Sequence, residues 1–123
     1  MSVFTNDPFD MLAKAFENLY PGHSYTAQLV PRIEDESGIE VWGETIYPDG
    51  EDAVFINVSA ELKISDAIEV FAHELSHAAA PGEDHGVAWK EAFNKLYQEY
   101  ERLMLVEYEL EQTDAPQMGG LSQ

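Results

Sequence analysis

Residues 65–85 have the sequence SDAIEVFAHELSHAAAPGEDH and contain three of the four histidines of the chain. His73 and His77 are four residues apart, so on a helix their side chains leave the same face one turn apart. Two imidazoles in this arrangement can bind one tetrahedral zinc ion, and Glu74 can reach a water on that metal without binding the metal itself. The His-Glu-x-x-His pattern therefore predicts a metal site on a helix.

The residues around this pattern favour a helix. We expect it to begin near Ser65, with Ser65 as the N-cap, and to end at about Ala80 before a Pro-Gly pair. Apolar residues gather on one side of the helical projection, namely Ile64, Ala67, Ile68, Phe71 and Leu75. His73 and His77 project roughly opposite to them, so the apolar side can pack on a core while the histidines line a cleft.

A catalytic zinc ion commonly has three protein ligands and keeps one position for water, so a third ligand is needed. His85 is the best candidate, because it follows a Pro-Gly pair that can fold the chain back toward the metal. Glu83 and Asp84 are adjacent carboxylates that can bind instead, and Glu91 is a further option. His23 follows another Pro-Gly turn and is expected to be a solvated loop residue.

The first half of the chain predicts one helix and a small sheet. Residues 7–20 have apolar side chains at helical spacing and end at a Pro-Gly pair, which indicates a helix. Residues 25–30, 38–47 and 52–58 are rich in β-branched and aromatic residues, and turn clusters such as residues 31–38 separate them. We expect an antiparallel three-stranded meander whose last two strands form a hairpin.

A long third helix is expected to begin just after His85 and to continue to about Glu111. Its core-facing stripe consists of Trp89, Phe93, Leu96, Tyr100 and Leu103. The predicted fold class is α+β: an N-terminal helix, a three-stranded antiparallel sheet, the helix of the metal site and the long C-terminal helix. We expect residues 1–111 to form a single domain and residues 112–123 to form a flexible C-terminal tail.

Composition argues against several classes of function. The 24 acidic residues and 6 basic residues give a net charge of −18, so direct binding to nucleic acids or anionic membranes is not expected. Cysteine is absent from the sequence, which leaves His, Asp and Glu as metal ligands. The N-terminus lacks the basic start and apolar run of a secretory signal, and no stretch approaches the roughly 20 apolar residues of a membrane span. These features predict a soluble, cytoplasmic protein.

The motifs HELSH at residues 73–77 and HGVAW at residues 85–89 resemble the SprT-like zinc metallopeptidases, the family that includes the Spartan proteases. Residues 56–62, INVSAEL, resemble the family's strand that ends in a polar residue followed by a leucine. The resemblance spans about residues 40–93 and implies a zincin-like metallopeptidase domain. It implies that His73, His77 and His85 bind Zn²⁺ and that Glu74 is the catalytic base.

The chain resembles a short form of this family. It has no cysteines for the zinc ribbon of many relatives, its connecting loop is shorter than in Spartan, and it is strongly acidic, so the DNA-linked activity of Spartan is not implied. Short relatives occur among phage proteins, for which the location would be the host cytoplasm. Metzincins match less well, because Ala80 and Glu83 stand where they need Gly and His. Bacterial endoribonucleases with three spaced histidines share Asp84-His85 but lack the helical Glu.

The expected function is zinc-dependent hydrolysis of peptide bonds in a peptide or protein substrate. Glu74 takes the proton of the attacking water and passes it to the leaving amine. The substrate is expected to lie extended along the strand at residues 52–58, taken as a sheet edge, and the acidic surface favours basic substrates. His23 and Tyr25 are the candidates for a second oxyanion donor.

Two other functions stay open at this point. In the first, a non-catalytic zinc ion fastens the second predicted helix to the third and stabilises a small domain. In the second, the charge of −18 belongs to an acidic binding protein that mimics nucleic acid and occupies a basic partner. The oligomeric state and the natural substrate are not indicated by the sequence.

Overall fold

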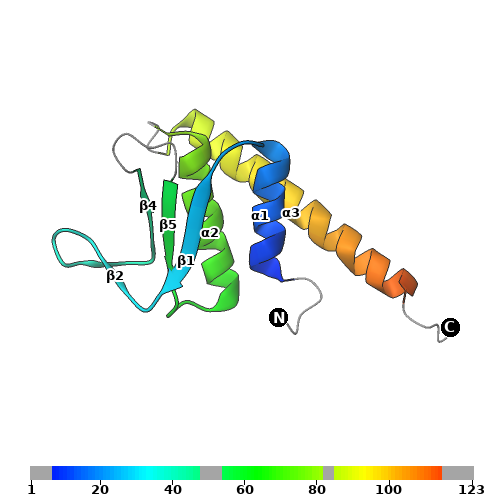
Figure 1. Cartoon of the computed structure of the whole chain (residues 1–123), viewed down its shortest axis with the longest axis horizontal. Helices are drawn as coiled ribbons and strands as arrows, with labels where there is room; N and C mark the ends of the chain where they lie inside the picture. Colours follow the sequence, from blue (N-terminus) through cyan, green and yellow to red (C-terminus); the bar gives the residue numbers. More distant parts are fainter. Residues whose placement is uncertain (1–6, 48–53, 82–84, 115–123) are drawn as a thin grey trace.

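A computed structural model describes residues 7–47, 54–81 and 85–114 of the chain. In chain order the elements are α1 (Pro8–Leu19), β1 (Tyr25–Val30), β2 (Ile33–Glu34), β3 (Glu40–Val41), β4 (Gly43–Ile46), β5 (Val54–Ser59), α2 (Ile64–Ala79) and α3 (Val87–Asp114). The helices pack beside a small sheet (Figure 1), which confirms the predicted α+β class.

α1 begins where the sequence supplies an N-cap. The Asp7 carboxylate accepts a 2.9 Å hydrogen bond from the backbone N–H of Phe9, and Pro8 occupies the first helical position, where no N–H partner is required. Leu12 and Phe16 are buried on the face that the apolar spacing predicted. The predicted helix over residues 7–20 is therefore confirmed to within one residue at each end.

The three-stranded sheet has the order β1-β5-β4. β4 pairs antiparallel with β5, as the predicted hairpin requires, but β1 pairs parallel with β5, from Tyr25 opposite Val54 to Val30 opposite Ser59. The predicted antiparallel meander is therefore wrong, because the sheet is mixed. Apolar alternation identifies strands but not their partners, and the long connection between β1 and β5 leaves room for the crossover that a parallel pair needs.

The central position of β5 corrects a second prediction. Residues 52–58 were expected to offer a free sheet edge, but the described part of that segment lies in β5, whose backbone pairs with β1 on one side and β4 on the other. Among the described strands, β4 forms the edge that lies against α2. Any peptide that extends the sheet beside α2 would therefore pair with β4.

The chain between β1 and β4 forms a separate two-stranded hairpin, β2 with β3, which extends away from the sheet (Figure 1). The Asp35 carboxylate accepts hydrogen bonds from the backbone N–H groups of Ser37 (2.8 Å) and Ile39 (3.0 Å), and Gly38 has a positive φ of 85°. This tight turn closes the hairpin. The strand predicted over residues 38–47 is thus divided into β3 and β4, and the turn predicted over residues 31–38 contains β2.

α2 carries the His-Glu-x-x-His pattern and packs against β4 and β5. Its buried side includes Ala67, Ile68, Phe71, Ala72 and Leu75, which form one core with side chains of α1 and β5. The helix begins at Ile64 with Lys63 as its N-cap and has no side-chain cap, so the prediction of Ser65 as N-cap is wrong. Ile64 itself is 61% exposed, because it lies in the first turn beyond the core.

α3 crosses α1 and α2, and its C-terminal part extends past the body of the molecule (Figure 1). Leu96 is buried and Phe93, Tyr100 and Leu103 are partly buried against the core, as the predicted stripe requires. The helix continues to Asp114, so residues 112–114 belong to it and not to the predicted tail. The rest of that predicted tail lies outside the described residues.

Candidate metal centre

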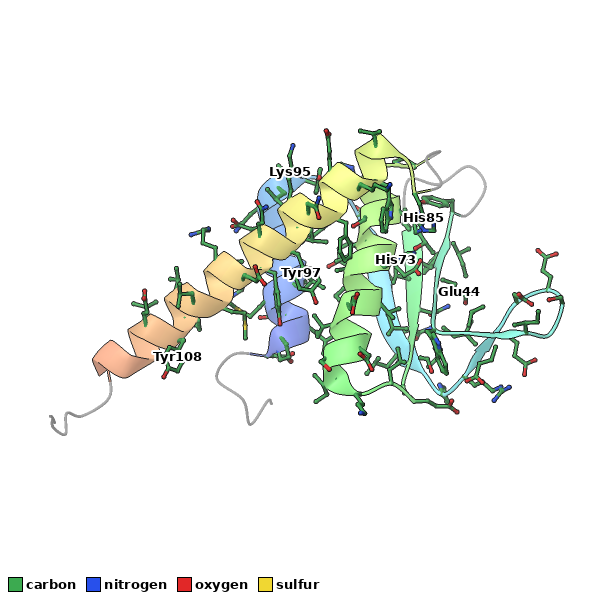
Figure 2. The ribbon with its side chains drawn as sticks, turned by 180° about the vertical axis from the view of Figure 1, so that it is seen from behind. Glu44, His73, His85, Lys95, Tyr97 and Tyr108 are labelled. Carbon is green, nitrogen blue, oxygen red and sulfur yellow. The ribbon has the colours of Figure 1, made fainter. Side chains whose placement is uncertain are left out.

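Three histidine rings converge beside the start of α3, where Figure 2 shows His73 on α2 close to His85. The Nε2 atom of His73 lies 3.3 Å from Nε2 of His77 and 3.0 Å from Nε2 of His85. The candidate ligand atoms of all three lie within 4.8 Å of one another. Two nitrogens on one tetrahedral zinc ion would be about 3.3 Å apart, since Zn–N bonds measure about 2.0–2.1 Å. The three rings can therefore hold one metal ion.

The electrostatics of His73 agree with this geometry. Burial lowers the pKa of His73 to about 4, and the neighbouring His77 and His85 rings contribute in the same direction. An imidazole with this pKa is neutral at pH 7 and presents a free lone pair. The neutral ring is the form that binds a metal ion.

His85 reaches the other two histidines from a loop. Its backbone has a φ of 63°, in the left-handed region, which an L-residue occupies at a cost of about 1–2 kcal/mol. Histidine is one of the residue types found there more often than average. The strained turn brings the ring of His85 back over α2, ahead of the first residue of α3.

Trp89 supports the three rings from α3. Its ring centroid lies 4.8 Å from that of His73, 5.7 Å from His77 and 4.7 Å from His85, and its Nε1–H donates a 3.3 Å hydrogen bond to the backbone oxygen of His73. On its other side Trp89 stacks on Phe93. The sequence placed Trp89 only in the core-facing stripe. Its position four residues after His85 was the only hint of a contact with the site, and helical spacing does not predict that contact because His85 precedes α3.

Glu74 is only 7% exposed and lies one residue beyond His73 on α2. Burial raises the pKa of its carboxyl, and a hydrogen bond from Thr45 opposes that rise. The Thr45 hydroxyl lies 2.6 Å from Oε1 of Glu74 and 3.2 Å from its backbone oxygen. Glu74 is not one of the three residues whose ligand atoms converge.

Gly43 lets β4 approach α2 at this point. A Cβ atom at Gly43 would lie 2.5 Å from Cγ1 of Val70 and 3.0 Å from Oε2 of Glu74. Because side chains alternate along a strand, Gly43 and Thr45 face α2 together. Gly43 leaves room for the Glu74 carboxylate, and Thr45 donates a hydrogen bond to it. Nothing in the spacing of these two strand residues had indicated a contact with Glu74.

A cleft of about 320 Å³ lies beside this carboxylate. Its lining consists of Trp42, Gly43, Glu69, Val70, His73 and Glu74. We call it the β4–α2 cleft, after the two elements that form it. Because both a candidate metal ligand and the buried carboxylate line it, a molecule in this cleft would lie next to the metal centre.

The other residues considered as ligands or donors lie elsewhere. Glu91 is exposed, and its charge adds to the effect of burial in raising the pKa of Tyr20. His23 is exposed and contacts the rings of Phe16 and Tyr20. Glu83 and Asp84 lie outside the described residues. The structure therefore assembles the three predicted histidines and gives no support to Glu91 as a ligand.

Tyr47, and not Tyr25, has a hydroxyl that contacts one of the candidate ligand residues. Tyr25, predicted as a possible oxyanion donor, packs its ring against Phe16 and Phe71. The hydroxyl of Tyr47 donates a 2.7 Å hydrogen bond to the backbone oxygen of His77. Tyr47 directly follows β4, and its place at the end of a predicted strand gave no sign of this contact.

Comparison of the chain with protein-family models, with curated proteins and with solved structures gave no match. Within the described ranges, none of the helices combines the length and the apolar character that crossing a bilayer requires. The chemistry of the site must accordingly be inferred from its residues and their geometry.

Proposed function

We propose that this protein is a zinc-dependent hydrolase, a peptidase of the SprT-like type with a zincin-like fold. His73, His77 and His85 would hold the Zn²⁺ ion. The observation that carries the proposal is the convergence of three imidazole nitrogens next to the buried carboxylate of Glu74, which does not belong to the group of candidate ligands. Nitrogen ligands suit zinc, and three protein ligands leave a fourth position open, as catalytic zinc sites do.

Glu74 is the general base of the proposed reaction. It accepts a proton from the attacking water and delivers it to the amine nitrogen of the leaving group. Burial raises the pKa of its carboxyl, which makes the carboxylate a stronger base toward the attacking water. Thr45 holds Oε1 of Glu74, while Oε2 lies over Gly43 beside the β4–α2 cleft. Zinc, when bound, supplies the Lewis acid that acidifies water and polarises the carbonyl.

The peptide substrate is proposed to lie along β4. The outer side of β4 is a sheet edge, so an extended peptide can pair with its main-chain groups. The β4–α2 cleft and Glu74 lie next to this edge, which would place the scissile bond near the metal centre. Tyr47 replaces His23 and Tyr25 as the candidate for a second oxyanion donor, and its single O–H would have to exchange the backbone oxygen of His77 for the oxyanion.

The test combines metal analysis with one substitution. Purified protein should contain about one zinc ion per chain, by the ligand count of a single three-histidine site. The zinc-loaded protein should cleave a reduced, alkylated and therefore unfolded protein substrate. Glu74→Gln should retain the zinc and lose at least about 100-fold in rate, the lower limit for a general base. Full activity of Glu74→Gln would falsify the assignment of Glu74 as the base.

A structural zinc site is the second candidate function. It is favoured by the way in which His85 and Trp89 connect α2 to the start of α3, since a metal ion at this point would fasten the two helices together. Thermal unfolding with and without a chelator, measured beside the activity assay, separates the two functions. A large chelator effect with no cleavage of the unfolded substrate would identify the site as structural.

A further inference from the structure

The β4–α2 cleft extends from the metal centre toward the N-terminal half of α2. Four of its lining residues come from α2, namely Glu69, Val70, His73 and Glu74. They occupy positions i, i+1, i+4 and i+5, so they share one face of the helix. The cleft therefore begins at the proposed reaction centre and ends about one helical turn away, at Glu69.

We propose that this cleft binds the side chain of the substrate residue next to the scissile bond and that it selects a basic side chain, arginine above all. The proposal rests on the proposed hydrolase function, because it takes the metal centre as the place of cleavage. It adds a substrate class and two residues, Trp42 and Glu69, that determine specificity.

The walls of the cleft suit the aliphatic part of a long side chain. Gly43 lines the cleft without adding a side chain to it, and its backbone lies close against Val70 and Glu74 of α2. Val70 offers an apolar surface, and the indole of Trp42 is 48% exposed although it lines the cleft. The methylene groups of arginine can pack along Val70, and its planar guanidinium can stack on the indole face.

Apart from the proposed metal ion itself, the charged side chains of the cleft are acidic. Glu69 is exposed at one end and Glu74 is buried at the other, while none of the six described lining residues is Lys or Arg. A cation is the complementary charge, and arginine is favoured over lysine because guanidinium is more weakly hydrated.

The experiment uses small probes whose binding does not require cleavage. N-acetyl-arginine hydroxamate and N-acetyl-norleucine hydroxamate carry the same metal-chelating group and differ in the charge of the side chain. The zinc-loaded protein should bind the arginine compound about tenfold more tightly, the scale expected for an exposed ion pair together with a cation–π contact. Glu69→Gln should remove most of this preference, and Glu69→Lys should reverse it toward N-acetyl-glutamate hydroxamate.

Glu36→Lys is the matched control. Glu36 lies in the exposed turn between β2 and β3, and its substitution changes the net charge by the same amount. It should leave the preference for arginine intact. Equal binding of the arginine and norleucine compounds, or an unchanged preference in Glu69→Lys, would overturn the inference and leave the metal centre standing. If the zinc-loaded protein binds none of the hydroxamates, both the proposal of an open metal position and the proposed role of the cleft would be wrong.

Discussion

The three histidines of the metal centre are held in two different ways. His73 and His77 lie on α2, where their separation is fixed by the helix and the opposite side is anchored in the core. His85 lies outside any helix, at a backbone φ of 63°, and is exposed. Two of the three ligands are therefore positioned by secondary structure, and the third depends on a strained backbone and on contacts that include Trp89.

This difference bears on how the site forms. A pair of ligands on one helix is organised as soon as the helix packs, because both rings leave the same face. A ligand from a loop must be brought to that pair, and the conformational entropy of the loop opposes its placement. Metal binding and the contact with Trp89 help to offset that cost.

The largest expected effect comes from removing ligands one at a time. His73→Ala leaves two ligands on separate elements, so we expect its zinc affinity to fall by more than about 100-fold, the upper end for loss of an outer-shell partner. His85→Ala leaves the helical pair intact, and its affinity should fall by a smaller factor. Competition with a chromophoric chelator measures both affinities.

His23→Ala is the control for this comparison, because His23 is exposed and contacts Phe16 and Tyr20. Its zinc affinity should equal that of the unmodified chain. If His85→Ala loses as much affinity as His73→Ala or more, the loop-borne ligand is as well organised as the helical pair. The proposed difference between the loop ligand His85 and the helical pair would then be wrong.

A second substitution addresses the support that α3 gives to the site. Trp89→Phe keeps an aromatic ring near the histidines but removes the N–H that donates to the backbone oxygen of His73. We expect zinc affinity to fall by about tenfold, the lower end for loss of an outer-shell partner. Trp42→Phe, a substitution of the other tryptophan, should leave it unchanged. Equal losses in the two variants would show that the Trp89 hydrogen bond has no specific role.

The same contrast explains what the sequence could predict. The helical pair followed from the spacing of His73 and His77 and from the apolar residues on the other side of α2, because helical geometry is local. His85 was identified as a candidate, but its strained backbone and its contact with Trp89 depend on how α3 packs. Glu83 and Asp84, the rival ligands, lie outside the described residues, so the choice rests on the His85 contacts.

The sheet was less predictable for the same physical reason. The strands were located by their composition, but the parallel pairing of β1 with β5 is a non-local fact that alternation does not encode. The contacts of Gly43 and Thr45 with Glu74 were not predicted either. Thr45 and Gly43 acquire their roles only because β4 lies against α2.

The smallest expected effect tests backbone strain directly, in protein freed of metal by a chelator. At position 85 only glycine adopts a φ of 63° without steric strain, so His85→Gly should be more stable than His85→Ala by about 1 kcal/mol. At position 73, inside α2, the order should reverse, and His73→Gly should be less stable than His73→Ala by about 1 kcal/mol. For a chain of this size each difference corresponds to about 4 °C in Tm.

Each pair of variants removes the same histidine, so loss of a ligand cannot account for a difference within a pair. The sign of that difference reports only whether the backbone at the position is helical or left-handed. Opposite signs at positions 73 and 85 would show that one ligand site is preformed by its helix and the other is held in strain. If His85→Ala were instead the more stable variant at position 85, as His73→Ala is expected to be at position 73, the backbone of His85 would not be held in a strained conformation.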